Sequence, residues 1–203
     1  LWGGLVTVIS NGVTIAIPDI EGTLMQTIMV GRIGGIFPVQ MLWALALSVF
    51  MWLLLNRHPF GENILFIGDN ERVAKVVGIS IDRERIKLFT LMGTLSALAG
   101  VFLTVETTTY FSQQGQGYLL TVIAAVFIGG TSIFGGSGKV VGTVFAAMIV
   151  AVIEAGLVAS GIQGFWTRFF IGVVFIISVV MNTALEDPNR VPIIKTIRSR
   201  MGH

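Results

Sequence analysis

Few side chains in this chain have both the type and the setting for chemistry. Glu154 is one of them, because its carboxylate interrupts an otherwise apolar run at 140–162. An ionised side chain inside such a run is costly and can line a solute pathway or relay protons. It can also be a structural partner of Arg168, which is expected at a similar depth on the next apolar run. The sequence favours the structural role, and neither His58 nor His203 has metal-ligand spacing around it.

Two glycine-containing segments resemble nucleotide-binding sequences only in part. The segment 133–140 ends like a phosphate-binding loop, but Ile133 stands at the first glycine position and Val140 replaces the hydroxyl residue that meets magnesium. The segment 115–120 has two of the three glycines of a dinucleotide fingerprint, with Leu120 in place of the third. We therefore expect no catalytic residue, no metal site and no cofactor bound by this chain.

The composition is that of an integral membrane protein. Of 203 residues, 54% are hydrophobic and only 12% are charged, whereas about 25% are charged in an ordinary soluble domain. The 25 glycines and 14 phenylalanines suit helices that pack closely in lipid. The chain has no cysteine, which excludes disulfides and thiolate chemistry within it.

Six apolar runs predict an all-α fold, a polytopic bundle of transmembrane helices in a single domain, 1–203. A helix rises about 1.5 Å per residue, so about 20 residues cross a hydrocarbon core of roughly 30 Å. The expected spans are 38–55, 88–105, 118–134, 140–162 and 165–181, with 1–17 as a partial one. The chain begins inside that first run, so we expect it to lack N-terminal spans.

Basic residues set the expected orientation, because Lys and Arg of short loops favour the cytoplasmic side. If the charged loop 56–87 faces the cytoplasm, alternate threading places the turn at 135–139 and the tail 182–203 there as well. Eleven of the 13 basic residues are then cytoplasmic, and Arg32 and Arg168 are not.

Three further segments lie between or within the expected spans. Apolar residues at helical spacing predict a short interfacial helix near 24–33. The external loop 106–116 is rich in hydroxyls and amides, which suit hydroxylated solutes but suit an ordinary wet loop better. Gly129-Gly130-Thr131 could divide the span 118–134 into a half-helix and a re-entrant loop.

A short, capped helix is predicted in the middle of the charged loop. Asp69 or Asn70 can cap its N-terminus by accepting backbone N–H bonds. Glu71 can pair with Lys75 at i,i+4, and Gly78 suits a left-handed C-terminal stop.

This short helix also has an apolar side, although it is expected outside the membrane. The side consists of three valines, Val73, Val76 and Val77. They can dock on a partner, or they can settle against the protein's own spans or the lipid interface. Spacing alone does not choose between these arrangements.

Two long motifs, in this order, resemble the permease subunits of bacterial ABC importers for monosaccharides. The first runs through the charged loop, with PFG at 59–61, IGDNE at 67–71, Ala74, GI at 78–79 and IK at 86–87. The second is AAVFIGGTSIFGGSG at 124–138, followed by VGT at 141–143. Asn11-Gly12 and Ile17-Pro18 are similar to the family's upstream segment. Where the family commonly has Gly-Gly-Asn-Glu, this chain has Gly68-Asp69-Asn70-Glu71, a modest departure.

The resemblance implies a coupling helix that enters a groove on a cytosolic ATPase. Its residues here are Gly68, Asp69, Asn70, Glu71, Ala74 and Gly78. It also implies a structural or gating role for the glycine-rich stretch, with Gly129, Gly130, Gly135, Gly136 and Gly138.

The resemblance further implies the partners and the location. A second permease subunit, identical or different, would complete the path, and a periplasmic or lipid-anchored solute-binding protein would deliver the solute. ATP and magnesium would bind the ATPase, membrane lipid would surround the chain, and nucleic acid has no place in the assembly. The location implied is the bacterial inner membrane.

Other functions fit the sequence less well. Branched-chain amino-acid permeases belong to the same broader superfamily, so an amino-acid solute stays open. A passive channel would need a continuous polar stripe along a span, and an intramembrane enzyme would need paired catalytic groups at one depth. Neither explains the capped loop helix together with the glycine-rich stretch.

Overall fold

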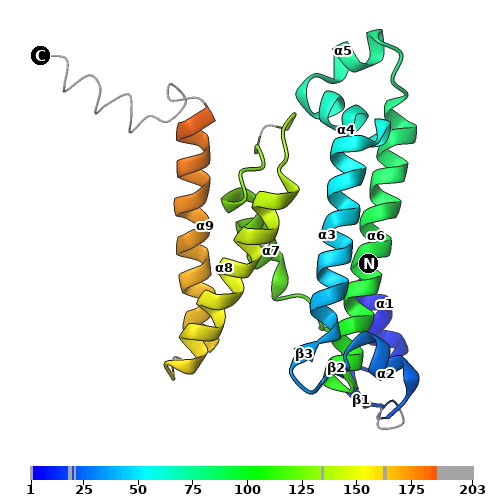
Figure 1. The fold of residues 1–203 in the computed structure, drawn as a ribbon, viewed down its shortest axis with the longest axis vertical. Coiled ribbons are helices and arrows are strands. Elements are labelled where there is room, and N and C mark those ends of the chain that lie inside the picture. The colour runs from blue at the N-terminus through cyan, green and yellow to red at the C-terminus, as the bar shows by residue number, and fades with distance from the viewer. Residues whose placement is uncertain (1, 18–19, 21, 134, 162–163, 187–203) are drawn as a thin grey trace, which may run out of the picture. The chain divides into compact units, whose positions relative to one another are not determined.

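The fold is mostly helical and divides into two compact units. A computed structural model of the chain describes residues 2–17, 20, 22–133, 135–161 and 164–186. Unit 1 comprises the described residues of 1–50 and 82–117, and unit 2 those of 51–81 and 118–203. Figure 1 labels the helices and strands of both units. The units are described separately below.

Unit 1 contains two short antiparallel strand pairs and most of two long helices. Its elements are α1 (Trp2–Ile9), β1 (Ile15–Ala16), α2 (Leu24–Met29), β2 (Arg32–Ile33), β3 (Phe37–Pro38), α3 (Val39–Arg57, up to residue 50), α6 (Ile81–Thr107, from residue 82) and β4 (Thr109–Tyr110). Strand β1 pairs with β4, so that Ile15 faces Tyr110, and β2 pairs with β3.

The first helix is much shorter than the expected run 1–17. Helix α1 ends at Ile9 because Asn11 and Gly12 take positive φ values of 50° and 66°. The N–H of Gly12 then donates to the carbonyl of Thr7, and the chain leaves the helix. The remaining residues of that run lead into β1, so the helical part of the prediction is wrong beyond Ile9.

A short helix is present where one was predicted, as α2, although it ends at Met29 instead of continuing to residue 33. The hydroxyl of Thr23 accepts from the backbone N–H of Gln26, and the Gln26 amide oxygen accepts from the N–H of Gly22. This is a variant of the reciprocal capping arrangement that begins many helices. The indole N–H of Trp43 donates to the carbonyl of Ile28 at 3.0 Å and ties α2 to α3.

Side chains near the start of α3 and the end of α6 join these two helices. The rings of Trp43 and Phe102 meet edge to face at 6.0 Å, and the amide of Gln40 donates to the Glu106 carboxylate at 3.2 Å. Helix α6 begins at Ile81, seven residues before the apolar run that predicted it. Acidic residues in its first turn favour the helix N-terminus, so the charged segment 82–87 is helical.

Unit 2 consists of the end of α3 and five further helices. These are α4 (Pro59–Asp69), α5 (Glu71–Val76), α7 (Tyr118–Ile128), α8 (Val140–Ala159) and α9 (Gly164–Glu186). Helix α7 packs against both α8 and α9 (Figure 1). Small and apolar residues form the contact between α7 and α8: Ala125, Ala146, Val150 and, at the edge, Ile128. Small side chains let the helix backbones approach closely.

Helix α7 is shorter than the expected span 118–134. Its 11 residues extend about 16 Å, roughly half of a hydrocarbon core. The N–H of Gly130 donates to Phe127 and that of Thr131 to Val126, with Gly130 at φ +81°. This is a Schellman stop, which ends the helix at the glycine pair. The half-helix alternative therefore describes the local geometry better than a continuous helix.

The last two helices also differ from the expected bounds. Helix α8 ends at Ala159 instead of 162, and α9 continues to Glu186, into the segment expected as a tail. The rest of that tail, 187–203, lies outside the described residues. Within the part of the chain that the structure describes, three helices are long and apolar enough to cross a membrane, namely α3, α6 and α8.

Candidate functional site

The junction between α4 and α5 is a single residue, Asn70. Its backbone is extended, with φ −153° and ψ 101°, and its N–H donates to the carbonyl of Phe66 at the end of α4. Its side-chain oxygen accepts from the N–H groups of Arg72 and Val73 at 3.1 and 3.2 Å. Of the two predicted caps, Asn70 is therefore the one in use, whereas Asp69 is the last residue of α4. The predicted helix thus begins at residue 71.

The predicted ion pair and C-terminal stop of α5 are both present. Gly78 has φ +92°, and the N–H of the following Ile79 donates to the carbonyl of Ala74 at 3.0 Å. The Lys75 ammonium lies 3.7 Å from the Glu71 carboxylate. Both charged side chains are largely exposed, so this pair adds little to stability. Helix α5 is therefore held mainly by its caps and by its packing on α4.

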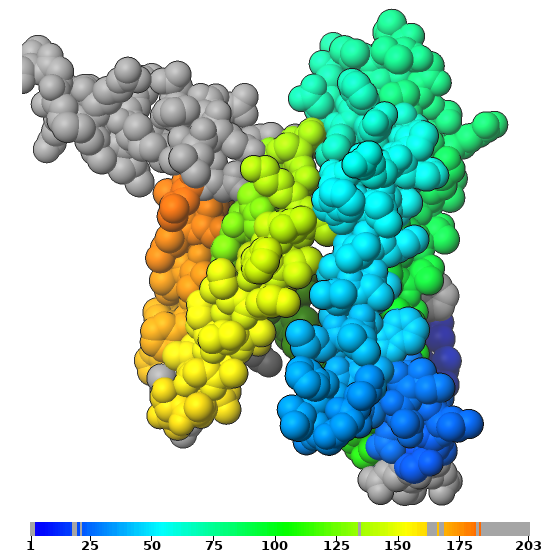
Figure 2. All heavy atoms as spheres, in the orientation of Figure 1, coloured from blue at the N-terminus to red at the C-terminus, as the bar shows by residue number. Residues whose placement is uncertain are grey.

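Helix α5 has one buried and one exposed face. Ala74 is 1% exposed, and α5 packs on α4. Val76 is 88% exposed and Val77 is also exposed, so neither valine packs on the other helices of unit 2. Figure 2 shows α5 at the surface of the molecule. A short polar-loop helix thus presents an uncovered apolar side.

The start of α4 follows α3 by a tight reversal. The ring nitrogen Nδ1 of His58 accepts from the N–H of Phe60 at 3.1 Å, and Pro59 occupies the first helical position. A Cβ on Gly61 would lie 2.5 Å from the Leu54 carbonyl oxygen, so only glycine fits there. His58 is therefore an N-cap, a role that its position in the sequence did not indicate.

The end of α4 touches the glycine-rich loop through backbone atoms. A Cβ added to Gly68 would lie 2.8 Å from the backbone nitrogen of Gly136. A Cβ on Gly135 would lie 2.5 Å from the Gly68 carbonyl oxygen, and one on Gly136 would lie 2.9 Å from Cβ of Asp69. Real Cβ atoms do not approach so closely, so these glycines permit a contact that other residues would block. The two motifs that stand out in the sequence therefore meet here.

A second glycine contact joins the end of α7 to the first turn of α8. A Cβ on Gly129 would lie 2.5 Å from Cα of Thr143, and one on Gly142 would overlap the Gly129 carbonyl oxygen. Between these helices the N–H of Ser132 donates to the carbonyl of Ser137 at 3.1 Å and closes the loop. Gly138 differs from the other loop glycines, because ordinary contacts surround its Cβ position.

Glu154 makes an inter-helix hydrogen bond. The hydroxyl of Thr121 on α7 donates to the Glu154 carboxylate on α8 at 3.0 Å, and both residues are partly buried. The side chain of Arg168, the other candidate partner, lies outside the described residues. Glu154 therefore connects α7 to α8 at a point well away from the glycine contact.

The structure reveals two buried or partly buried polar side chains, Glu84 and Gln114, that the sequence analysis did not single out. Glu84 is 6% exposed, and its carboxylate accepts from the Lys87 ammonium at 3.0 Å on α6. Gln114 accepts from the Thr104 hydroxyl at 3.2 Å, while its amide nitrogen has no hydrogen-bond partner among the described residues. The i,i+3 spacing of Glu84 and Lys87 could have indicated their pairing, but no sequence signal indicates the burial.

The described residues contain no group of three or more acidic or histidine side chains that could hold a metal ion.

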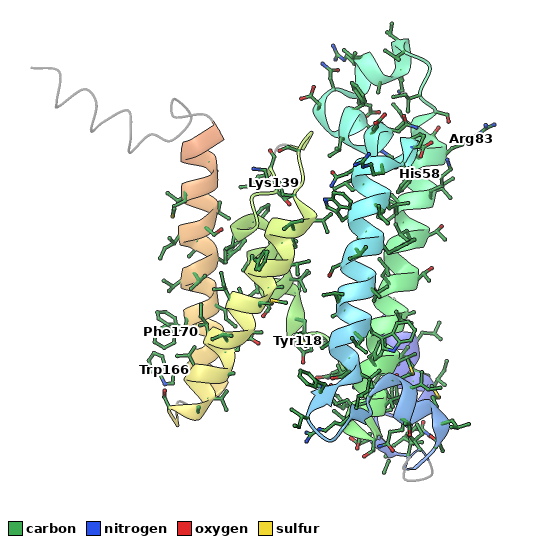
Figure 3. All side chains as sticks on the ribbon, in the orientation of Figure 1. His58, Arg83, Tyr118, Lys139, Trp166 and Phe170 are labelled. Carbon is green, nitrogen blue, oxygen red and sulfur yellow. The ribbon has the colours of Figure 1, made fainter. Side chains whose placement is uncertain are left out.

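Lys139 and two aromatic residues lie at opposite ends of the helix pair α8 and α9. Figure 3 shows Lys139 at the start of α8, whereas Trp166 and Phe170 lie at the far end, near the start of α9. Tryptophan is enriched at membrane–water interfaces, and lysine at the cytoplasmic ends of spans. This arrangement is typical of helices that cross a bilayer.

These features define a multi-pass helical membrane protein with a capped, partly apolar helix in its main polar loop. The chain belongs to the family described as branched-chain amino acid transport system / permease component, whose model matches residues 5–179.

Three similar proteins are named as import permeases. The chain is 37% identical to the ribose import permease protein RbsC of Bacillus subtilis, over 71% of this chain and 45% of that protein. It is 36% identical to the fructose import permease protein FrcC of Rhizobium meliloti, over 74% of this chain and 42% of that protein. It is 32% identical to the autoinducer 2 import system permease protein LsrD of Salmonella typhimurium, over 70% and 43%. The chain thus spans less than half the length of these relatives, and no solved structure gives a significant match.

Proposed function

We propose that this chain is part of the permease subunit of an ATP-binding-cassette importer that moves a sugar, and most simply a monosaccharide, into the cytoplasm. The observation that carries the proposal is the likeness to permeases named for ribose and fructose import, over more than 70% of the chain. The family description itself names amino acids. The named sugar permeases favour a sugar over a branched-chain amino acid.

We assign the loop 56–87 and the C-terminal tail to the cytoplasmic side of a bacterial inner membrane. The distribution of Lys and Arg supports this orientation. The backbone contact between Gly68 and Gly136 supports placing the loop 56–87 and the turn 135–139 on one side of the membrane. In this assignment α3, α6, α8 and α9 cross the membrane, and α7 enters it only partway.

The proposed docking element is α5. Its exposed valines would enter an apolar groove on a cytosolic ATPase, while Ala74 holds the helix on α4. ATP and magnesium would bind that ATPase, and this chain would contribute no catalytic group. A second permease subunit and a periplasmic or lipid-anchored solute-binding protein would complete the importer. ATP binding would bias the permease between inward- and outward-facing packings, a rigid-body switch.

The test is copurification of the ATPase with the full-length protein and its neighbouring subunits. We expect Val76→Asp to reduce the retained ATPase about tenfold, because burying a valine is worth about 1.5–3 kcal/mol and 1.4 kcal/mol is tenfold in affinity. The matched control is Ile36→Asp, since Ile36 is similarly exposed, at 78%, but lies in a segment assigned to the other side. Equal ATPase retention in the two variants would refute docking through α5.

The solute is tested separately in proteoliposomes with the complete importer. ATP hydrolysis and uptake are measured with ribose, fructose, leucine and isoleucine as added solutes. We expect stimulation by a sugar and none by the two amino acids. Stimulation by leucine or isoleucine alone would replace the sugar assignment with an amino-acid one.

A further inference from the structure

We propose that the contact of Gly68 with Gly135 and Gly136 transmits movement of the docking helix to α7 and α8, backbone against backbone. This inference rests on the proposed function, because it needs a partner that moves α5. It assigns to these glycines a positioning role in coupling. The argument follows the contacts from α5 inward.

Helices α4 and α5 are built to move as one body. Asn70 caps both of them, through its backbone N–H on α4 and its side-chain oxygen on α5. Ala74 is buried where α5 packs on α4, and Gly78 then stops α5 sharply. A force applied to the exposed face of α5 therefore reaches the C-terminal turn of α4, where Gly68 lies.

The next contact is made by backbone atoms and by Cβ of Asp69, whose position does not change with the rotamer. Buried side chains can change rotamer, whereas backbone groups already in van der Waals contact cannot approach each other further unless one segment moves. The Cβ positions of Gly68, Gly135 and Gly136 are all occupied by atoms across the contact, at 2.5–2.9 Å. A shift of the α4 end toward the loop that joins α7 to α8 must therefore displace that loop.

This loop is itself firmly connected to both helices. The Ser132–Ser137 hydrogen bond closes it, and Gly129 lies directly on Gly142 and Thr143 of α8. The Thr121–Glu154 hydrogen bond ties the same two helices again, about 16 Å further along α8. Movement that enters at Gly68 would thus reach the far end of α7, where a solute path would be gated.

The decisive variant is Gly68→Ala. Gly68 lies in a helix, where alanine is intrinsically better than glycine. A functional loss would therefore come from the contact with the loop and not from helix propensity. The matched controls are Gly138→Ala in the same loop, with ordinary space around its Cβ, and Gly172→Ala in α9, with nothing within 4 Å.

The readout is independent of the transported solute. The variant Leu119→Cys places a cysteine at an exposed position in the first turn of α7, and the 203 residues contain no other cysteine. Its reaction rate with N-ethylmaleimide is measured with and without ATP and vanadate, in the full-length importer complex with any other cysteines replaced. ATPase copurification is measured on the same samples.

We expect the wild-type background and both controls to show an ATP-dependent change in labelling rate, and Gly68→Ala to lose it while retaining the ATPase. An unchanged ATP response in Gly68→Ala would overturn the inference, as would a wild-type complex whose α7 cysteine ignores ATP. Loss of the ATPase from Gly68→Ala would also overturn it, because the contact would then only shape the docking surface. If the wild type itself retains no ATPase, the proposed function fails instead.

A second pair of variants tests the same contact if Gly68→Ala does not fold. Gly136→Ala places a Cβ against that of Asp69, at 2.9 Å, and Asp69→Gly removes this neighbouring atom. We expect Gly136→Ala to lose the ATP response and the double variant to regain part of it, a non-additive result that direct contact requires. Additive effects of the two substitutions would contradict transmission through this contact.

Discussion

The cap at Asn70 gives a quantitative prediction for the docking helix. Helix α5 has six residues, too few for a stable helix in isolation, so its caps decide its stability. Asn70→Ala removes the acceptor of the Arg72 and Val73 N–H groups. It leaves the backbone bond to Phe66 intact, and its φ of −153° suits alanine. Loss of an N-cap costs about 1 kcal/mol, which corresponds to a roughly fivefold larger open population of α5.

The assay is amide hydrogen exchange of the purified protein in detergent, followed by mass spectrometry. Peptides covering 74–79 contain the N–H groups that close α5, including that of Ile79 to Ala74. We expect their exchange to accelerate about fivefold in Asn70→Ala, since exchange reports local opening. Asn70→Asp keeps a side-chain oxygen acceptor at the cap, now a carboxylate, and should exchange like the wild type. Unchanged exchange in Asn70→Ala, or equal acceleration in both variants, would refute the capping argument.

Three further substitutions test the helix contacts by thermal unfolding in detergent. Gly142→Ala places a Cβ on the Gly129 carbonyl, and overpacking of about 1–2 kcal/mol should lower the melting temperature by roughly 5 °C; no decrease would contradict the contact. Thr121→Val removes the hydrogen bond to Glu154 and should cost about 1.5 kcal/mol, whereas an unchanged melting temperature would mean that the bond is dispensable. Trp43→Phe removes the indole N–H that donates to the carbonyl of Ile28 in α2, which should cost about 1 kcal/mol. Because this change is local, we also expect faster proteolysis within 24–38. Equal cleavage rates in the variant and the wild type would contradict a role of this hydrogen bond in holding α2.

The long apolar helices and the caps of α5 could be predicted because each depends on neighbouring residues. Helix α3 occupies 39–57 where hydropathy predicted 38–55, and Gly78 takes the left-handed conformation that its position suggested. The choice between Asp69 and Asn70 could not be predicted, since both are equally good N-caps. It depends on where α4 ends, which hydropathy does not reveal.

Other features depend on contacts that local spacing does not contain. Glycine is tolerated inside membrane helices, so Gly129-Gly130 alone did not distinguish a continuous helix from the stop that ends α7 at Ile128. The charged start of α6 fell outside every apolar run, although it is helical. The contact of Gly68 with Gly136 joins segments far apart in the chain. Both segments stood out as motifs, but nothing in either indicated that they touch.

The pairing of β1 with β4 has a consequence for biosynthesis. Ile15 and Tyr110 face each other although about 95 residues separate them, and the N–H of Ile17 donates to the carbonyl of Thr108 beside them. At about 5–20 residues per second, the ribosome needs roughly 5–20 s to make the intervening chain. During that interval the β1 segment has no strand partner, and both α3 and α6 must be synthesised before it gains one. The pairing of β1 with β4 should therefore form late, after α3 and α6 have been inserted. In a ribosome-bound chain that ends before β4, a protease should cleave the β1 segment.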